Sequence, residues 1–390
     1  MTTPKYVYVD GDAHILEPRD LWERYLEPKY RARAPKVVTN PNGLKGDWWV
    51  TENLRPVSAT SGGLLGATRD IKKLEEAQAE AKLDEFRLGG WDPAWRLKDM
   101  AVDNVGGGVM YPTNSGTLYS LTDVQFQAAC FRAYNNWIGE FNSHDPKRLA
   151  GVALIPNLDV DEAVKEIKRT AKLGFKGGLI DASVDNKLDG YGDLYWEPMW
   201  QAFEDTGMIA SFHTFNGKFW WPQDHDRRIQ KIAINMDYPI RRSLIEMVFW
   251  GVFDRHPKLK VIVAEFRIGW LPHFLWALDD RFKTRSHWRP MCKKLPREYW
   301  NTQCWVVTLH EPELFMNSLP FIGEDRMLWS TDYPHIESTW PKSQEALVEL
   351  MPGASASTIK KVARDNAARL YGFTFTDLSP EATKLKVAVK

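Results

Sequence analysis

The sequence predicts an α/β fold, a (β/α)8 TIM barrel with an insertion after the first strand. Two observations predict this fold: short apolar runs alternate with longer helical patterns, and there are eight such runs. We expect helices between most of the strands, at 123–144, 159–174, 196–207, 240–257 and 272–285. Eight strands followed by helices are typical of this barrel. The eight predicted strands are 6–10, 108–112, 150–156, 177–181, 209–213, 260–265, 304–308 and 327–332.

Each element has its own local signal in the chain. After the first strand, residues 29–90 break the alternation with an Asn-Gly turn signal, a stretch rich in Gly, Ser and Thr, and a charged helix. We interpret this segment as an insertion that covers the mouth of the barrel. The helix at 159–174 has apolar residues at helical spacing and ends in a glycine, which is a plausible cap. We expect one domain over residues 1–375, with 376–390 as a peripheral tail.

Composition excludes several classes of partner. Lys and Arg together number 51, as do Asp and Glu, so the net charge is zero and a nucleic-acid-binding surface is not expected. No apolar run is long enough to span a membrane, and the first residues do not resemble a secretion signal. The three widely spaced cysteines, Cys130, Cys292 and Cys304, fit reduced thiols in a cytoplasmic protein. We therefore expect a small-molecule substrate as the partner.

Imidazoles and carboxylates recur at the carboxyl ends of the predicted strands. In a barrel of this type the active site lies at these ends. Such a set of side chains suits Zn²⁺, Fe²⁺ or Mn²⁺, so the sequence predicts a divalent metal site. The residues at the strand ends are Asp10, Asp12, His14, Asp181, His213, Glu265 and Asp332.

Three stretches resemble a known family. The segments VDGDAHILEP, SFHTF and LWSTDYPHIESTWP are similar to the amidohydrolase superfamily, in the branch that contains aminocarboxymuconate-semialdehyde decarboxylase and resorcylate decarboxylases. The resemblance extends from about residue 6 to 372. It implies a metal held by Asp12 and His14 on the first strand, His213 on the fifth and Asp332 on the eighth. It also implies a homodimer, since members of the branch often dimerise.

The chain departs from the pattern of this superfamily in three places. The H-x-H element of the first strand is D-A-H here, and Glu265 stands where many relatives have a histidine. The fourth strand ends in GGLIDAS and has no lysine that could be carboxylated. A pair of metals bridged by a carbamate is therefore not expected, although one or two ions remain possible.

The roles of several residues stay open. Glu265 could face the metal, bridge to a second ion, act as a general base or pair with Arg267. His335 could contact substrate, orient Asp332 or form only a loop hydrogen bond. We favour a catalytic role for Asp332, Glu265 and His335, with Glu265 also a metal ligand. A more ordinary interpretation remains possible for each strand end, as a core histidine, a helix cap or a turn.

We expect a metal-dependent hydrolase that acts on an ester, thioester, amide or related acyl bond of a bulky apolar or aromatic substrate. A metal-activated water would attack, and Asp332 would move its proton. We expect Trp221, Trp270 and Tyr333 to contact the substrate. The alternative is a metal-dependent non-oxidative decarboxylase of an aromatic or related acid, in which an acid protonates the ring carbon. An inactive binding barrel is a remote third possibility, because none of the four implied ligands is missing.

Overall fold

A computed structural model describes the chain except for residues 1–6, 61–80, 183, 185–189, 215–236 and 375–390. Three expectations concern residues outside the described part: substrate contact by Trp221, the peripheral tail at 376–390, and the part of the insertion at 61–80. Apart from residue 6, the eight predicted barrel strands lie within the described residues, and a strand is present at each of them. The α/β class predicted from the sequence is therefore confirmed.

The barrel strands form two parallel ladders, in the orders β1-β5-β6 and β12-β11-β10-β9-β8-β7. Every residue in these strands is buried, as expected where helices cover a parallel sheet. The strands are β1 (Tyr8–Ile15), β5 (Val105–Pro112), β6 (Leu149–Gly151), β7 (Ala153–Leu154), β8 (Gly177–Ile180), β9 (Ile209–His213), β10 (Val261–Ala264), β11 (Cys304–Thr308) and β12 (Met327–Trp329).

The ladder is interrupted at two places, so the expected closed barrel is only partly present among the described residues. Between β6 and β7 the break is one residue, Val152, whose N–H still donates to the Met110 carbonyl at 3.0 Å. Between β12 and β1 no ladder forms, and single backbone bonds join the segments instead, from Asp332 N–H to the Asp12 carbonyl at 3.2 Å and from His14 N–H to the Tyr333 carbonyl. The short β12 ends before the chain turns, which prevents a regular ladder.

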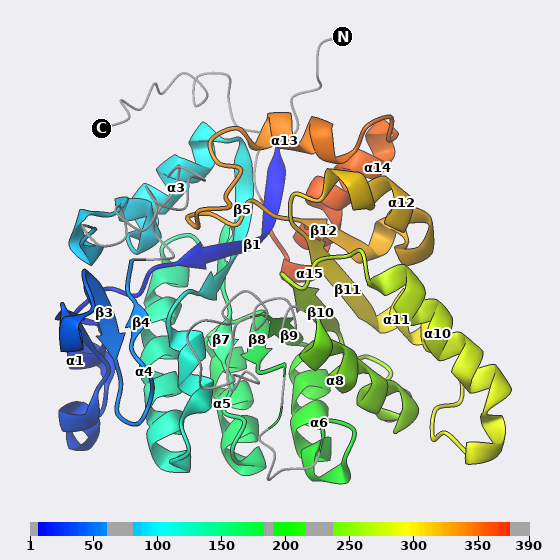
Figure 1. Cartoon of the computed structure of the whole chain (residues 1–390), viewed down its shortest axis with the longest axis horizontal. Helices are drawn as coiled ribbons and strands as arrows, with labels where there is room; N and C mark the ends of the chain where they lie inside the picture. The colour runs from blue at the N-terminus through cyan, green and yellow to red at the C-terminus, as the bar shows by residue number, and fades with distance from the viewer. Residues whose placement is uncertain (1–6, 61–80, 183, 185–189, 215–236, 375–390) are drawn as a thin grey trace.

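Helices cover the outer face of the curved sheet (Figure 1). Side chains cap several of them: Asp159 accepts from the N–H of Glu162 at the start of α5, and Asp123 caps α4 in the same way. The helices are α1 (Leu21–Tyr25), α3 (Pro93–Val102), α4 (Val124–Ser143), α5 (Val160–Lys172), α6 (Glu197–Thr206), α8 (Tyr238–Phe249), α9 (Val252–Arg255), α10 (Leu271–Thr284), α11 (Pro296–Gln303), α12 (Pro312–Ile322), α13 (Ser343–Leu350), α14 (Ala356–Lys360) and α15 (Asn366–Tyr371).

The described part of the insertion contains a small antiparallel sheet, β2 (Lys36–Thr39), β3 (Asp47–Val50) and β4 (Val57–Ser58). The segment joins the outer side of α4: Arg33 bonds Asp123 at 2.9 Å, and its guanidinium lies over the ring of Phe126 at 4.2 Å. A lid over the barrel mouth stays a prediction.

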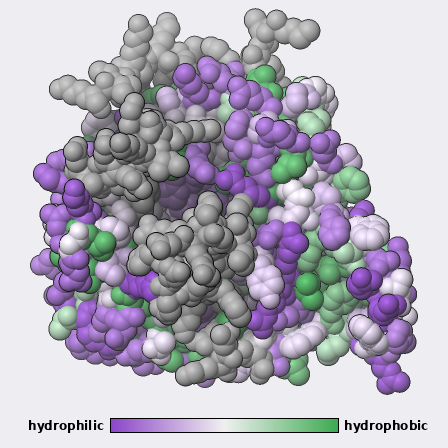
Figure 2. All heavy atoms as spheres, in the orientation of Figure 1, coloured by the Kyte–Doolittle hydropathy of each residue, from purple (hydrophilic) through white to green (hydrophobic). Residues whose placement is uncertain are grey.

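The outer surface is mostly hydrophilic on the face shown in Figure 2, with hydrophobic side chains exposed on its right-hand side. Exposed apolar residues of the outer helices include Trp276 on α10 and Leu314 and Phe321 on α12. The homodimer implied by the resemblance stays a prediction. No helix in the described part of the chain is both long and apolar enough to cross a membrane.

Candidate metal centre

The first strand supplies two of the groups at the centre. Asp12 and His14 are two residues apart on β1, and their side chains point to the same side of the strand because side chains alternate along it. Asp12 Oδ1 lies 3.6 Å from His14 Nε2. His213, at the end of β9, brings its Nε2 to 3.3 Å from the same Asp12 oxygen. Three of the predicted ligands therefore meet from two strands that are far apart in the sequence.

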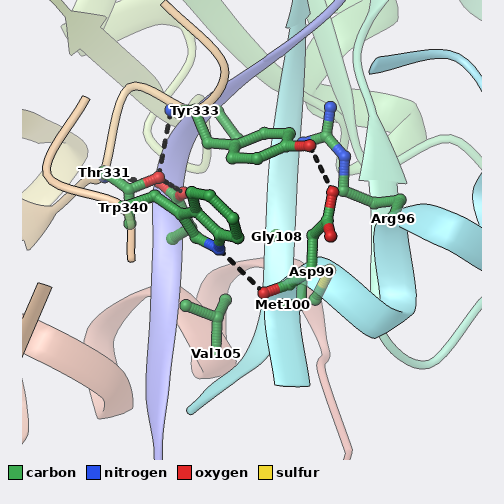
Figure 3. A pocket seen from close by; sticks show the side chains of 10 residues that line it. Arg96, Asp99, Met100, Val105, Gly108, Thr331, Tyr333 and Trp340 are labelled. Atoms are coloured by element: carbon green, nitrogen blue, oxygen red, sulfur yellow. Dashed lines mark hydrogen bonds between the residues drawn. The ribbon is translucent and has the colours of Figure 1, made fainter. Parts of the chain in front are cut away.

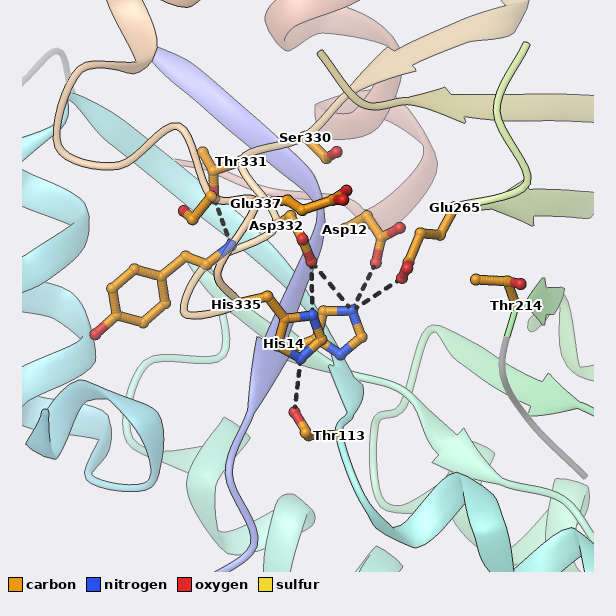
Figure 4. Close-up of polar contacts among 12 residues, drawn as sticks. Asp12, His14, Thr113, Thr214, Glu265, Ser330, Thr331, Asp332, His335 and Glu337 are labelled. Atoms are coloured by element: carbon orange, nitrogen blue, oxygen red, sulfur yellow. Dashed lines mark hydrogen bonds and ion pairs between the residues drawn. The ribbon is translucent and has the colours of Figure 1, made fainter. Parts of the chain in front are cut away.

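Two carboxylates complete the group from the loops after β10 and β12. Glu265 Oε2 lies 2.9 Å from His213 Nε2 and 3.5 Å from His14 Nε2. Asp332 Oδ1 lies 3.6 Å from His14 Nε2 (Figure 4). Both residues have left-handed backbones, with φ of 60° for Glu265 and 56° for Asp332. A side-chain-bearing residue adopts this conformation at a cost in energy, and such strain concentrates at functional sites.

Backbone carbonyls orient the two imidazoles. His14 Nδ1 lies 3.2 Å from the Pro112 carbonyl, and His213 Nδ1 lies 2.8 Å from the Thr214 carbonyl. A carbonyl can only accept, so each Nδ1 carries the proton when the ring is neutral. The Nε2 lone pair of each ring then faces the other groups, which is the arrangement of metal-binding histidines.

The donor atoms suit a divalent cation. Buried atoms that make no hydrogen bond within the described residues include both carboxylate oxygens of Asp12, Nε2 of His14 and Oε2 of Glu265. Burying such atoms without a partner is costly. The described donors close enough to share an ion form two sets that overlap at His14: Asp12, His14 and His213, and His14, Glu265, Asp332 and His335. Ligand bonds of about 2.0–2.2 Å would place neighbouring donors roughly 3–3.5 Å apart, close to the separations given above.

The protonation of these groups reflects burial and mutual charge. Burial raises the pKa of Asp12 to about 7 and that of Asp332 to about 6. Burial alone would raise the pKa of Glu265, but the neighbouring His213 and His14 outweigh it and lower that pKa. Burial would likewise lower the pKa of His213, but Asp12 and Glu265 outweigh it and raise that pKa. Three carboxylates in one buried place need positive charge, which a divalent cation supplies.

His335 lies beside the centre and contacts one of its carboxylates. Its Nδ1 is 2.9 Å from Asp332 Oδ1, its Nε2 is 3.1 Å from Thr113 Oγ1, and its ring stacks on that of His14 with 3.8 Å between centroids. Burial alone would lower the pKa of His335, but the Asp332 carboxylate outweighs it and raises that pKa. The structure shows this contact with Asp332, and the role of His335 stays a prediction.

A comparison with known families decides the affiliation of the chain. The profile of the family described as Amidohydrolase matches residues 46–373. The chain belongs to this family. The resemblance noted in the sequence is confirmed.

Individual relatives of this chain are decarboxylases. It is 26% identical over 243 residues to a gamma-resorcylate decarboxylase of Polaromonas, a match covering 57% of this chain and 71% of the relative. It is 26% identical over 293 residues to the 2-amino-3-carboxymuconate-6-semialdehyde decarboxylase of Dictyostelium discoideum, covering 72% of this chain and 75% of the relative.

Solved structures show the same fold. An amidohydrolase of Mycobacterium avium subsp. paratuberculosis is 22% identical, with a TM-score of 0.75, over 95% of this chain and all of that one. The 5-carboxyvanillate decarboxylase of Novosphingobium aromaticivorans, in complex with manganese and 4-hydroxy-3-methoxy-5-nitrobenzoic acid, is 18% identical, with a TM-score of 0.66, over 94% of this chain and 96% of that one.

These comparisons overturn the expectation of a hydrolase. That expectation depended in part on a metal-facing role for Glu265, with a bridge to a second ion as one of its open roles. In the structure Glu265 lies within 3.5 Å of the imidazoles of His14 and His213. These contacts do not distinguish one ion from two, and the named relatives are decarboxylases.

Two buried carboxylates outside the donor group accept hydrogen bonds from backbone N–H groups near it. Asp10, one of the residues at the predicted strand ends, accepts from the N–H of Thr331 at 3.0 Å and from that of Asp12 at 3.2 Å. Sequence reasoning missed Glu17, a buried carboxylate that accepts from the N–H of Ser115 at 2.7 Å. The only signal for Glu17 was a carboxylate following the apolar residues after His14.

Tyr333 does not face the donor group. Its side chain is 4% exposed, and its hydroxyl donates to Asp99 Oδ2 at 2.5 Å beneath the guanidinium of Arg96 (Figure 3). It lines a cavity of about 20 Å³, roughly the room for one water. Its side chain supports the loop, and substrate contact by Tyr333 stays a prediction.

Trp270 is also occupied within the protein. Its side chain is 8% exposed, its indole N–H donates to the carbonyls of Phe266 and Arg267, and the guanidinium of Arg241 lies over its ring at 5.1 Å. The indole is used in closing the loop, and substrate contact by Trp270 stays a prediction. Asp181 lies outside the described groups of side chains that could hold a metal.

Proposed function

We propose that this protein is a metal-dependent non-oxidative decarboxylase of an aromatic or related carboxylic acid. The observation that carries the proposal is a cluster of metal-binding donors around His14 in which one carboxylate, Asp332, also contacts the imidazole of His335 at 2.9 Å. The activities named for the curated relatives support it.

The proposed metal ligands are Asp12, His14, His213, Glu265 and Asp332. We propose one ion, because His14 belongs to both sets of donors, and Mn²⁺ in particular. Carboxylate-rich sites suit manganese, and the decarboxylase structure of Novosphingobium contains it. When bound, the ion supplies positive charge that attracts the carboxylate of the substrate and stabilises negative charge on it.

The protein residues supply the proton that decarboxylation consumes. The bond between the ring carbon and the carboxylate carbon breaks, and CO₂ leaves. The electron pair of that bond stays on the ring carbon, which then takes one proton. Asp332 and His335 would pass this proton between them and on to the ring carbon. Nδ1 of His335 lies 2.9 Å from Asp332 Oδ1, and Thr113 holds the far side of the His335 ring at 3.1 Å.

The test is product analysis with manganese-loaded protein and a panel of acids that includes 2,6-dihydroxybenzoate and 5-carboxyvanillate. We expect CO₂ and the decarboxylated arene in equal amounts. Asp332→Asn should lower the rate by about a hundredfold or more, the range for loss of a general acid. Asp325→Asn, at an exposed carboxylate paired with Lys361, is the matched control. Consumption of an acid without CO₂ release would contradict the proposal.

A further inference from the structure

The donor group is strongly acidic, and one more carboxylate lies close to it. Glu337 lies on the loop after β12, five residues beyond the donor Asp332. Figure 4 shows the Glu337 side chain on the same side of the site as Asp12 and Asp332. An acidic substrate approaching this place meets repulsion unless a cation compensates for it.

The guanidinium of Arg267 lies next to Glu337. Arg267 follows Glu265 by two residues, and its Nη2 donates to Glu337 Oε2 at 2.8 Å. The ion pair therefore joins the loop after β10 to the loop after β12, and each of these loops also carries one member of the donor group. The side chains are 31% exposed for Arg267 and 60% exposed for Glu337, so solvent reaches both.

The ion pair can be exchanged at low cost. Exposed pairs of this kind contribute little to stability, because water screens them and both long side chains lose freedom. A carboxylate from a ligand offers Arg267 the same chemical group that Glu337 now offers. Displacement of Glu337 would also move its negative charge away from the incoming acid.

The backbone holds Arg267 in place for this exchange. Its φ is 61°, a left-handed conformation, and its carbonyl accepts from the indole N–H of Trp270 at 3.0 Å. The next N–H, that of Ile268, donates to the buried Glu311 at 3.0 Å. Because the loop backbone is fixed on both sides, it loses little conformational entropy when the guanidinium binds a ligand.

We propose that Arg267 is a specificity-determining residue that binds a second carboxylate of the substrate, and that Glu337 occupies it until the substrate arrives. The substrate class is then a dicarboxylic acid, with one carboxylate at the metal centre and one at Arg267. This inference rests on the proposed function for the fate of the first carboxylate, but binding itself needs no turnover.

The test compares a monoacid with diacids in calorimetric titrations of manganese-loaded protein. The probes are benzoate, isophthalate and terephthalate. Wild type should bind at least one diacid about tenfold or more tightly than benzoate, the effect of one charged hydrogen bond. Arg267→Gln should remove this preference and leave benzoate affinity unchanged, and Arg267→Lys should keep part of it. Glu337→Gln should tighten diacid binding.

The matched control is Arg281→Gln, an exposed arginine on α10 paired with Asp280. A wild type without diacid preference, or the same preference in Arg267→Gln, overturns the proposal. The outcomes separate the two proposals. If diacid preference depends on Arg267 but no acid releases CO₂, the diacid inference holds and the decarboxylase proposal is wrong. If CO₂ is released but diacids are not preferred, the decarboxylase proposal holds and the diacid inference is wrong.

Discussion

At the scale of single residues, the site depends on two carboxylates held by an unfavourable backbone. Glu265 and Asp332 lie in the loops after β10 and β12 in left-handed conformations, with their carboxylates near the imidazoles of β1 and β9. An extended backbone at either position would aim the carboxylate elsewhere. These two left-handed residues cost conformational energy, and they bring the donors together.

Glu265→Gln should weaken Mn²⁺ binding by at least about tenfold, because a neutral amide replaces a charged donor 2.9 Å from His213. Calorimetric titration of metal-free protein measures the affinity. Glu349→Gln, an exposed position, provides the control. Unchanged affinity in Glu265→Gln would show that this carboxylate is not a ligand.

Thr113→Val should lower kcat by about five- to tenfold with metal content unchanged, since it removes one hydrogen bond to His335 Nε2. Steady-state CO₂ release and metal analysis of the same samples measure the two effects. Thr284→Val, which removes an exposed hydroxyl on α10, is the comparison. Equal kcat in wild type and Thr113→Val would mean that the orientation of His335 does not limit turnover.

At the scale of elements, α3 fixes the segments that carry the ligands. Arg96 on α3 is buried and donates to the carbonyls of Gly89 and His14, and its guanidinium lies over the ring of Tyr333 at 4.4 Å. Tyr333 in turn bonds Asp99 on the same helix (Figure 3). One helix thus holds both β1 and the loop after β12, where no regular ladder joins them.

Gly89→Ala should destabilise the protein by roughly 1–3 kcal/mol, because the added Cβ would lie 2.3 Å from Asp99 Oδ2 and 2.6 Å from the Tyr333 hydroxyl. Denaturant unfolding measures this loss. Gly108→Ala is a suitable control, since its nearest neighbours lie at 3.9 Å. Equal stability of the two variants would mean that the side chains around Gly89 can move to accept the added Cβ without loss of stability.

At the scale of the whole molecule, one buried acid outside the donor group affects the pH dependence of stability. Burial raises the pKa of Asp103 to about 7, although the N–H and hydroxyl of Ser343 both donate to its carboxylate. The folded protein therefore holds a proton that the unfolded chain releases at about pH 4. Stability should fall as the pH rises from about 4 to about 7.

Asp103→Asn should remove this contribution. The stability of the variant relative to wild type should rise across that pH range by on the order of 1 kcal/mol per unit. Urea unfolding at a series of pH values measures the difference. Parallel curves for the two proteins would contradict the assignment of the proton to Asp103.

Much of the fold and the candidate site was predictable, because strand ends of a parallel sheet converge. Asp12, His14, His213 and Asp332 could be grouped from their positions at these ends, and the structure brings them together. Side-chain direction beyond the strands was not predictable. Tyr333 follows a left-handed residue, and the sequence does not show that turn.

The chemistry was the least predictable part of the site. A carboxylate at Glu265 has the same sequence signal whether it joins one ion or bridges two. The support from α3 was missed as well, because Arg96 lies in a helix of mixed charged and apolar residues that resembles a solvated surface helix.

The central claim is a single-metal decarboxylase centre, and a metal titration of activity tests it most directly. Metal-free protein would receive increasing Mn²⁺ while CO₂ release is measured from the acid found in the product analysis. The account predicts that activity rises in proportion to the metal added and stops rising at one ion per chain. A break at two ions per chain, or full activity without added metal, would contradict it.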